Sequence, residues 1–295
     1  MDPGIRGARV PGRTLVGVAA DRLRRERAGA WEVVRPGGAR LLRGVEVVGY
    51  RDTGAAGVDM RVLPQPRLTL VLTFGGDPLA VETSDGRRGL EGLVAGLAPA
   101  GARIRGERVS CVEVRMSPVA AYSLLGTAPA DLDGAVVGLR DLWGRPETHL
   151  RERMATCARW EDRLALVDAF LARRWDAAPR MTAEVAASWS AIVARRGRVR
   201  VDDLAAACGW SRKRLWSRFT AQVGLTPKRA AMLVRFDRAV RALSTGTGAA
   251  ETAESCGYAD QSHLHRDVRA FAGCTPAVLA GRMRRDPDGV WQQGW

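Results

Sequence analysis

The chain has 295 residues, of which 46% are apolar and 26% are charged, and its formal net charge is +14 at pH 7. That length and apolar content are enough for two domains with apolar cores, and they exclude a disordered chain. The sequence has no run of 18 apolar residues and no apolar run behind its first basic residues, which argues against a membrane span and a signal peptide. We therefore expect a cytoplasmic protein.

The N-terminal part of the sequence predicts a basic arm followed by a β-rich domain. Residues 1–40 predict the arm, which we expect to be poorly ordered. Residues 67–74 (RLTLVLTF) and 109–116 alternate between apolar and polar side chains, as half-buried strands do. Gly-rich and Pro-rich joints separate such runs, so residues 41–148 are predicted to form a small β-sandwich or barrel.

Residues 149–178 are predicted to be helical and to join this domain to the next. Apolar residues between Leu150 and Trp175 fall mostly at three- and four-residue steps, and Glu161 interrupts the row. Two interpretations stay open: the helix packs on its own domain, or it pairs with a second copy as a dimer helix. Pro179 ends this segment.

The remaining sequence predicts an all-α domain over residues 179–285 and a tail over residues 286–295. Residues 181–196 are expected to form the first helix of this domain. The predicted fold class is therefore α+β, with a β-rich domain in front of an all-α domain.

The all-α part contains one short pattern twice. Residues 204–219 are LAAACGWSRKRLWSRF, and residues 252–268 are TAESCGYADQSHLHRDV. In each copy a helix of small residues ends at Cys-Gly, an aromatic residue follows, and a second helix begins. Gly209 and Gly257 stand where the chain must turn sharply, and we expect a positive φ at both. The pattern predicts two helix-turn-helix units and favours DNA binding.

The second helix of each unit is the predicted recognition helix. Leu215 and Phe219, four residues apart, face the core of the first unit, and Leu264 faces the core of the second. A polar, basic face is thereby turned outward, and its candidate base-contacting residues are Lys213, Arg214, Trp216, Ser217, Gln261, Ser262, His265 and Arg266. Candidate phosphate contacts are Arg212, Lys228 and Arg229. For the bulky Trp216, contact with a thymine methyl or sugar and packing on the protein surface both stay open.

A connecting helix is predicted over residues 226–243. Pro227 suits the first turn of a helix, and the apolar residues that follow it have helical spacing. About 17 residues of helix span roughly 25 Å. With the width of the flanking units added, the two recognition helices are expected about 34 Å apart, which is one turn of DNA.

The charge is concentrated in the same part of the chain. Residues 180–285 hold 19 Lys/Arg and 8 Asp/Glu, whereas all other residues together hold 27 and 24. A basic domain of this kind is typical of a surface that binds phosphates.

The C-terminal part of the sequence resembles the AraC/XylS type of transcription regulator. The resemblance is carried by residues 201–219, by GLTP at 224–227 with the helix after it, and by CGYADQSHLHRDVRAFAGCTP at 256–276. It implies a DNA-binding domain that holds both units in one chain, behind a cupin-like sensing or dimerising domain. The sequence departs from the family at Thr252 and Val268, where larger apolar residues are usual, so the second unit is expected to be less tightly packed.

The predicted function is that of a sequence-specific transcription regulator that binds double-stranded DNA in successive major grooves, under the control of its N-terminal domain. The further partners expected are a small-molecule effector, a second copy of the chain and, for an activator, RNA polymerase. One alternative is a sequence-insensitive basic accessory factor with a ligand-binding β domain. The other alternative is an enzyme.

Little in the sequence supports the enzyme. The three histidines (His149, His263 and His265) lie outside the β region, and the five cysteines form neither a C-x-x-C pair nor a metal-ligand spacing. The sequence has no Ser-His-Asp arrangement, phosphate loop or dinucleotide-binding fingerprint. We therefore expect no catalytic residue, no metal and no cofactor.

Overall fold

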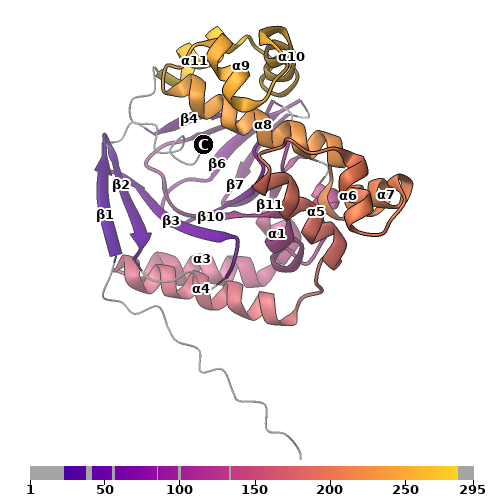
Figure 1. The fold of residues 1–295 in the computed structure, drawn as a ribbon. Coiled ribbons are helices and arrows are strands. Elements are labelled where there is room, and N and C mark those ends of the chain that lie inside the picture. The colour runs from indigo at the N-terminus through magenta and orange to yellow at the C-terminus, as the bar shows by residue number, and fades with distance from the viewer. Residues whose placement is uncertain are drawn as a thin grey trace, which may run out of the picture.

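The computed structural model describes residues 23–37, 42–54, 57–84, 86–98, 101–132 and 134–284. Within these residues, strands dominate the N-terminal half, and only helices follow it (Figure 1). The predicted α+β class is confirmed.

The strands form two antiparallel sheets. The strands are β1 (Leu23–Ala28), β2 (Trp31–Pro36), β3 (Val45–Asp52), β4 (Val58–Arg61), β5 (Leu68–Thr73), β6 (Leu79–Thr83), β7 (Gly86–Leu90), β8 (Gly92–Ala95), β9 (Arg103–Gly106), β10 (Ser110–Met116) and β11 (Val136–Gly138). The larger sheet has the order β1-β2-β3-β10-β5-β8-β11, and the smaller sheet has the order β4-β9-β6-β7. The predicted strands at residues 67–74 and 109–116 are β5 and β10, the two neighbours at the centre of the larger sheet.

An apolar core fills the space between the two sheets. Alternate residues of the larger sheet, such as Val48 and Val71, meet Leu79 and Val81 of the smaller sheet there. The opposite face of the larger sheet, which includes Leu70 and the other alternate residues, packs on helices. Both faces of the central strands are therefore buried.

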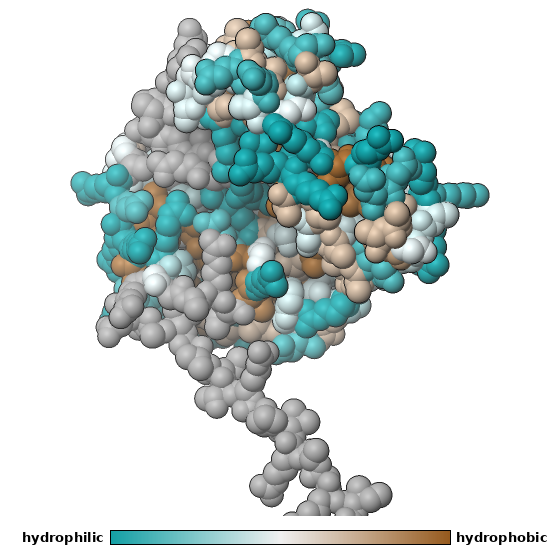
Figure 2. Space-filling model, in the orientation of Figure 1, coloured by the Kyte–Doolittle hydropathy of each residue, from teal (hydrophilic) through white to brown (hydrophobic). Residues whose placement is uncertain are grey.

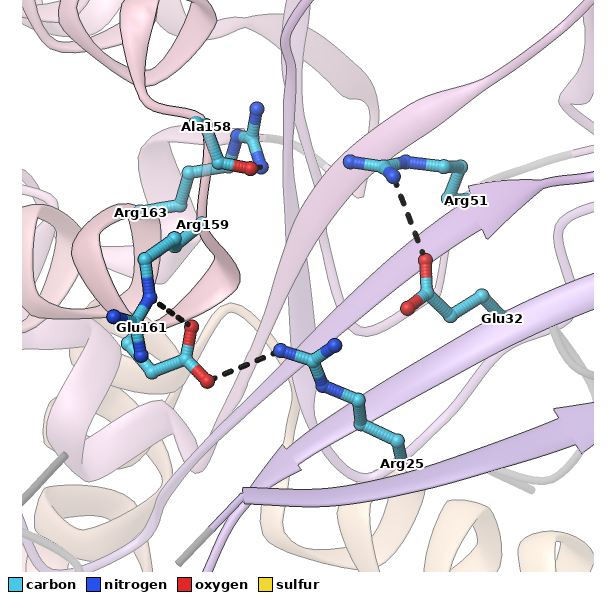
Figure 3. A network of polar contacts seen from close by, with 7 residues as sticks. All are labelled: Arg25, Glu32, Arg51, Ala158, Arg159, Glu161 and Arg163. Atoms are coloured by element: carbon cyan, nitrogen blue, oxygen red, sulfur yellow. Dashed lines mark hydrogen bonds and ion pairs between the residues drawn. The ribbon is translucent and has the colours of Figure 1, made fainter. Parts of the chain in front are cut away.

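The predicted arm is wrong for residues 23–36, which form the β1–β2 hairpin in register from Leu23–Pro36 to Ala28–Trp31. An arginine-rich strand can lie at the edge of a sheet because its backbone supplies the pairing and its charged side chains stay in water. The rest of the predicted arm lies outside the described residues, except Gly37. The hairpin is tied to the helices by Arg25, whose guanidinium lies 3.1 Å from the Glu161 carboxylate (Figure 3).

Helices make up most of the rest of the molecule. They are α1 (Pro118–Leu124), the 3-10 helix η1 (Pro129–Leu132), α2 (Leu139–Trp143), α3 (Arg145–Thr156), α4 (Trp160–Ala177), α5 (Ala183–Ala194), α6 (Val201–Ala207), α7 (Arg212–Val223), α8 (Pro227–Ser244), α9 (Ala249–Cys256), α10 (Gln261–Ala272) and α11 (Pro276–Arg284).

The helical segment expected between Leu150 and Trp175 is two helices, α3 and α4, which run side by side (Figure 1). Arg163 holds the corner between them, since its guanidinium donates to the backbone carbonyls of Met154, Cys157 and Ala158. Trp160 then packs edge-on against Phe74, with ring centroids 5.4 Å apart. The apolar side of α4 is thereby used within the chain, as the first of the two interpretations expected.

The C-terminal helices lie against the N-terminal domain at one recognition helix. Helix α7 contacts α1 and η1. A Cβ on Gly224, the residue that ends α7, would lie 3.0 Å from the Cα of Ala130. The hydroxyl of Ser123 also donates to the Pro179 carbonyl at 2.9 Å, at the joint between the two parts.

Candidate nucleic-acid interface

The first helix-turn-helix unit consists of α6 and α7. Gly209 turns the chain between them with a φ of +63°. The hydroxyl of Ser211 then accepts a hydrogen bond from the Arg214 amide, which caps α7. Leu215 and Phe219 are completely buried, so the predicted inward face of α7 is confirmed.

The second unit, α9 and α10, has the same construction. Gly257 has a φ of +80°, and the Asp260 carboxylate accepts from the His263 amide at 2.6 Å. Leu264 and Val268 are fully buried. Each recognition helix therefore begins at a capped N-terminus a few residues after a left-handed glycine, and the repeated pattern predicts that turn.

The candidate base-contacting residues all lie in the first two turns of α7 and α10, and all eight are exposed. Trp216 keeps 54% of its surface exposed, so it does not pack away against the protein. The guanidinium of Arg214 lies 4.7 Å from the ring centre of Trp210, which limits its freedom. Contacts of these residues with bases stay a prediction.

Helix α7 has one more exposed basic residue than the sequence pattern predicts. Arg218 is exposed and lies four residues after Arg214, on the same side of the helix. The spacing alone could have identified it. It adds a fourth exposed basic side chain to α7, after Arg212, Lys213 and Arg214.

The candidate phosphate-binding residues are exposed but not equally free. Arg212 forms an ion pair with Asp202 of α6 at 3.0 Å. The Arg229 guanidinium lies 5.2 Å from the Phe271 ring centre, across the start of α8. Lys228 is exposed beside it, at the N-terminus of a helix that the Thr226 hydroxyl caps.

Helix α8 joins the units, which lie at its two ends (Figure 1). Its buried residues include Leu233, Phe236 and Val240, so it is fixed along its length by the helices it connects. On the face shown in Figure 2, hydrophilic side chains gather over α8 and around α6 and α7. The spacing of about 34 Å between recognition helices stays a prediction.

A buried ion pair, Glu113 with Arg115, lies in the β domain. The Arg115 guanidinium contacts the Glu113 carboxylate at 2.8 Å and donates to the Tyr50 hydroxyl at 2.9 Å. Burial is the largest single effect and would lower the pKa of Arg115, but the charge and hydrogen bonds of Glu113, with the charges of Tyr50 and Glu46, together raise it. Arg115 therefore stays charged inside the domain.

A cavity of about 50 Å³ lies between the two sheets beside Glu113, with mainly apolar walls that include Met60, Val71 and Leu93. A volume of this size holds one or two water molecules.

Two further findings concern the described part of the chain alone. It contains no group of three or more His, Cys, Asp or Glu side chains placed to hold a metal. None of its helices combines the length and the apolar character that a membrane span needs.

The C-terminal region matches a model of a known protein family. A family model described as a helix-turn-helix domain matches residues 204–282. An uncharacterized HTH-type transcriptional regulator of Bacillus subtilis (strain 168), YbfI, is 35% identical over 66 residues, which are 22% of this chain and 24% of that protein. The match thus spans about a quarter of that relative.

Solved structures of regulators are also similar to this chain. A transcriptional regulator of Chromobacterium violaceum with an AraC-type DNA-binding domain is 22% identical, with a TM-score of 0.33 over 35% of this chain and 94% of its own. The DNA-binding domain of AdpA, crystallised with a target DNA, is 26% identical, with a TM-score of 0.34 over 36% and 98%. ToxT of Vibrio cholerae O395 is 10% identical, with a TM-score of 0.46 over 82% and 99%.

Two helix-turn-helix units on one connecting helix define a DNA-binding class of domain. With the family match over residues 204–282, this part of the chain is a helix-turn-helix domain.

Proposed function

We propose that this protein is a sequence-specific transcription regulator that binds double-stranded DNA with α7 and α10 in successive major grooves. One observation carries the proposal: two capped recognition helices with exposed polar and basic first turns stand at opposite ends of one rigid helix. A single chain of this form can contact two half-sites, and base contacts at both would give sequence preference.

The charge of the domain supports the same proposal. Its exposed arginines and lysines would neutralise phosphates and release counterions, so binding should weaken steeply as salt rises. Salt dependence alone does not separate a regulator from a basic accessory factor, because both share it. The separating property is the ratio of specific to non-specific affinity.

Selection of DNA fragments from a random pool by the purified full chain tests the proposal. We expect one enriched sequence with two half-sites about one helical turn apart, bound at least about 10³-fold more tightly than random DNA at the same salt concentration. Enrichment of no sequence, with equal affinity for all fragments, would instead support the accessory factor.

We infer that the N-terminal domain regulates this binding. It contacts α7 directly through α1 and η1, so a change in the domain has a short path to a recognition helix. The cavity of about 50 Å³ is too small for a metabolite-sized effector, which would have to open the sandwich or bind elsewhere. Titration of small-molecule pools against thermal stability would identify such an effector.

A second copy and RNA polymerase are further proposed partners. The inward residues of α4, including Leu164, Val167 and Leu171, are buried within the chain, so a dimer would have to use another surface. Sedimentation with and without the selected DNA measures the number of copies. Transcription in vitro from a promoter that carries the selected site distinguishes an activator from a repressor.

A further inference from the structure

The last turn of α9 is held by an arginine that lies just before the other helix-turn-helix unit. Arg198 lies in the loop between α5 and α6, just before the first unit. Its Nη2 donates to the Ser255 carbonyl at 2.9 Å and lies 3.5 Å from the Glu254 carbonyl. Arg238 of α8 adds a longer contact with the Ser255 carbonyl, at 3.4 Å. Two guanidinium groups thus meet the end of one helix.

A further arginine, Arg235, joins the same loop to the second recognition helix. Arg235 of α8 donates from Nη1 to the Gly197 carbonyl at 2.8 Å, and its Nη2 lies 3.9 Å from the Asp267 carboxylate on α10. Its guanidinium also lies 5.7 Å from the Tyr258 ring centre. We call Arg198, Arg235 and Arg238 the arginine bridge.

The loop that carries Arg198 cannot move freely along α8. A Cβ on Gly197 would lie 2.3 Å from the Ala231 carbonyl oxygen, so this glycine is pressed against the backbone of α8. A Cβ on Gly257 would lie 2.2 Å from Nε of Arg198. Close packing at Gly197 therefore fixes the base of the Arg198 side chain, and the missing side chain at Gly257 leaves room for its end.

The physical effect of these contacts is to join the two units by a route other than α8. The last carbonyls of a helix lack partners within the helix and carry its negative partial charge, so a guanidinium binds them well. The carbonyls that Arg198 contacts lie directly before the turn that starts α10. The contact therefore fixes the position of α10 relative to the first unit, close to the end that would meet DNA.

We propose that Arg198 is a positioning residue that sets the spacing and rotational phase of the two half-sites this protein accepts. This rests on the proposed function, since it concerns how the two recognition helices share one DNA duplex. Insertion of one base pair between the half-sites moves the second one by about 3.4 Å and rotates it by about 34°. A molecule whose units are bridged cannot follow that movement, whereas one held by α8 alone follows it partly.

The test measures affinity for the selected site and for versions with one base pair inserted or removed between the half-sites. For the wild-type full chain we expect a penalty of about tenfold or more at either change. For Arg198→Ala we expect that penalty to fall to about threefold. Arg198→Lys keeps the charge but not the fork that serves two carbonyls, and its penalty should lie between these values. Arg195→Ala, an exposed arginine of the same loop, is the matched control and should keep the wild-type penalty.

A direct phosphate contact of Arg198 would give a different result. It would weaken binding equally at all three spacings and reduce the dependence on salt by about one ion, and Lys would restore most of the affinity. An unchanged spacing penalty in both Arg198→Ala and Arg198→Lys overturns the proposal. If the wild-type chain selects no DNA sequence, the proposed function itself fails, so the two failures can be told apart.

Discussion

Thr252 is completely buried in α9, yet its hydroxyl has no hydrogen-bond partner among the residues that the structure describes. Replacement of this residue by valine removes the buried hydroxyl and leaves the shape nearly unchanged. We expect Thr252→Val to raise the free energy of unfolding by about 1 kcal/mol, because an unsatisfied buried polar group costs about that much. Urea denaturation of the full chain measures it.

The same change at Thr226 should have the opposite sign. The Thr226 hydroxyl accepts a hydrogen bond from the Arg229 amide and caps α8, so Thr226→Val should cost about 1 kcal/mol.

Thr252→Ile tests whether spare space adjoins the Thr252 side chain, as the departure from the family pattern predicts. A loss of stability in Thr252→Val would show that the hydroxyl is satisfied in solution, by water for example.

Arg266 and Arg229 are predicted to contribute to DNA binding in different ways. Arg266 is exposed in the first turns of α10, so Arg266→Ala should cost about 1–3 kcal/mol at the selected site and relax the preference at one base position. Arg229→Ala, at the start of α8, should weaken binding similarly for every sequence. Affinities of both variants for the selected site and for random DNA check this, and equal losses on the two DNAs for Arg266→Ala would contradict its assignment.

Asp168 makes the stability of the N-terminal part depend on pH. Burial raises the pKa of this α4 carboxyl from 3.8 to about 6. The folded chain therefore holds more protons than the unfolded chain between those values, and stability falls as the pH rises through this window. We expect Asp168→Asn to raise the free energy of unfolding at pH 8 by about 1–2 kcal/mol and to have little effect near pH 4.

Denaturation at both pH values measures this effect, with Asp176→Asn, an exposed position near the end of the same helix, as the control. A gain of the same size at pH 4 and pH 8 would show that the benefit of asparagine comes from packing and not from the charge.

At the scale of single elements, the two recognition helices end alike but have different surroundings. Gly224 ends α7 and Gly273 ends α10, both in the left-handed region, with φ of +84° and +65°. A Cβ on Gly273 would meet nothing within 4 Å, whereas one on Gly224 would meet η1. Gly273→Ala should therefore cost only the backbone strain, about 1 kcal/mol.

Gly224→Ala should cost more, because the same strain is joined by a clash with Ala130. We expect it to loosen the contact between α7 and the N-terminal domain, which faster hydrogen exchange in residues 128–132 would reveal. Equal destabilisation by the two variants, with unchanged exchange in η1, would show that the contact adjusts without cost.

The sequence predicts those elements that depend on local signals. Gly209 and Gly257 act within a few residues of their place in the chain, and both have the positive φ that the sequence predicts. Ser211 and Asp260 cap the helices that follow these turns. Helix periodicity likewise predicts the buried face of α7. Local signals are sufficient here because turn and cap geometry is fixed by neighbouring residues.

The features that local sequence patterns do not predict depend on residues far away in the chain. Strand β1 has no alternating pattern, and it exists because β2 offers it a backbone edge. Arg198 resembles its neighbours Arg195, Arg196 and Arg200 in sequence, and only its contact with Ser255, 57 residues away, distinguishes it. The corner between α3 and α4 similarly depends on the carbonyls that Arg163 gathers. None of these features has a signature in a single sequence.

At the scale of the whole molecule, charged groups of the N-terminal domain and of the C-terminal helices interact. Burial lowers the pKa of Arg67, at the start of β5, and the charge of Asp237 on α8 opposes that effect. Asp237 is itself buried and paired with Arg241 at 3.2 Å. The connecting helix therefore has a buried acidic group whose charge acts on an arginine of the β domain.

Because of the contact between η1 and α7, the two helix-turn-helix units differ in how they pack on the N-terminal domain. Helix α7 contacts the N-terminal domain through η1 and α1, whereas the main contacts of α10 are with α8, α9 and α11. If the chain binds DNA as proposed, a change in the N-terminal domain would act first on α7, and α10 could stay bound. The proposed regulator could then respond to a signal without first leaving its site.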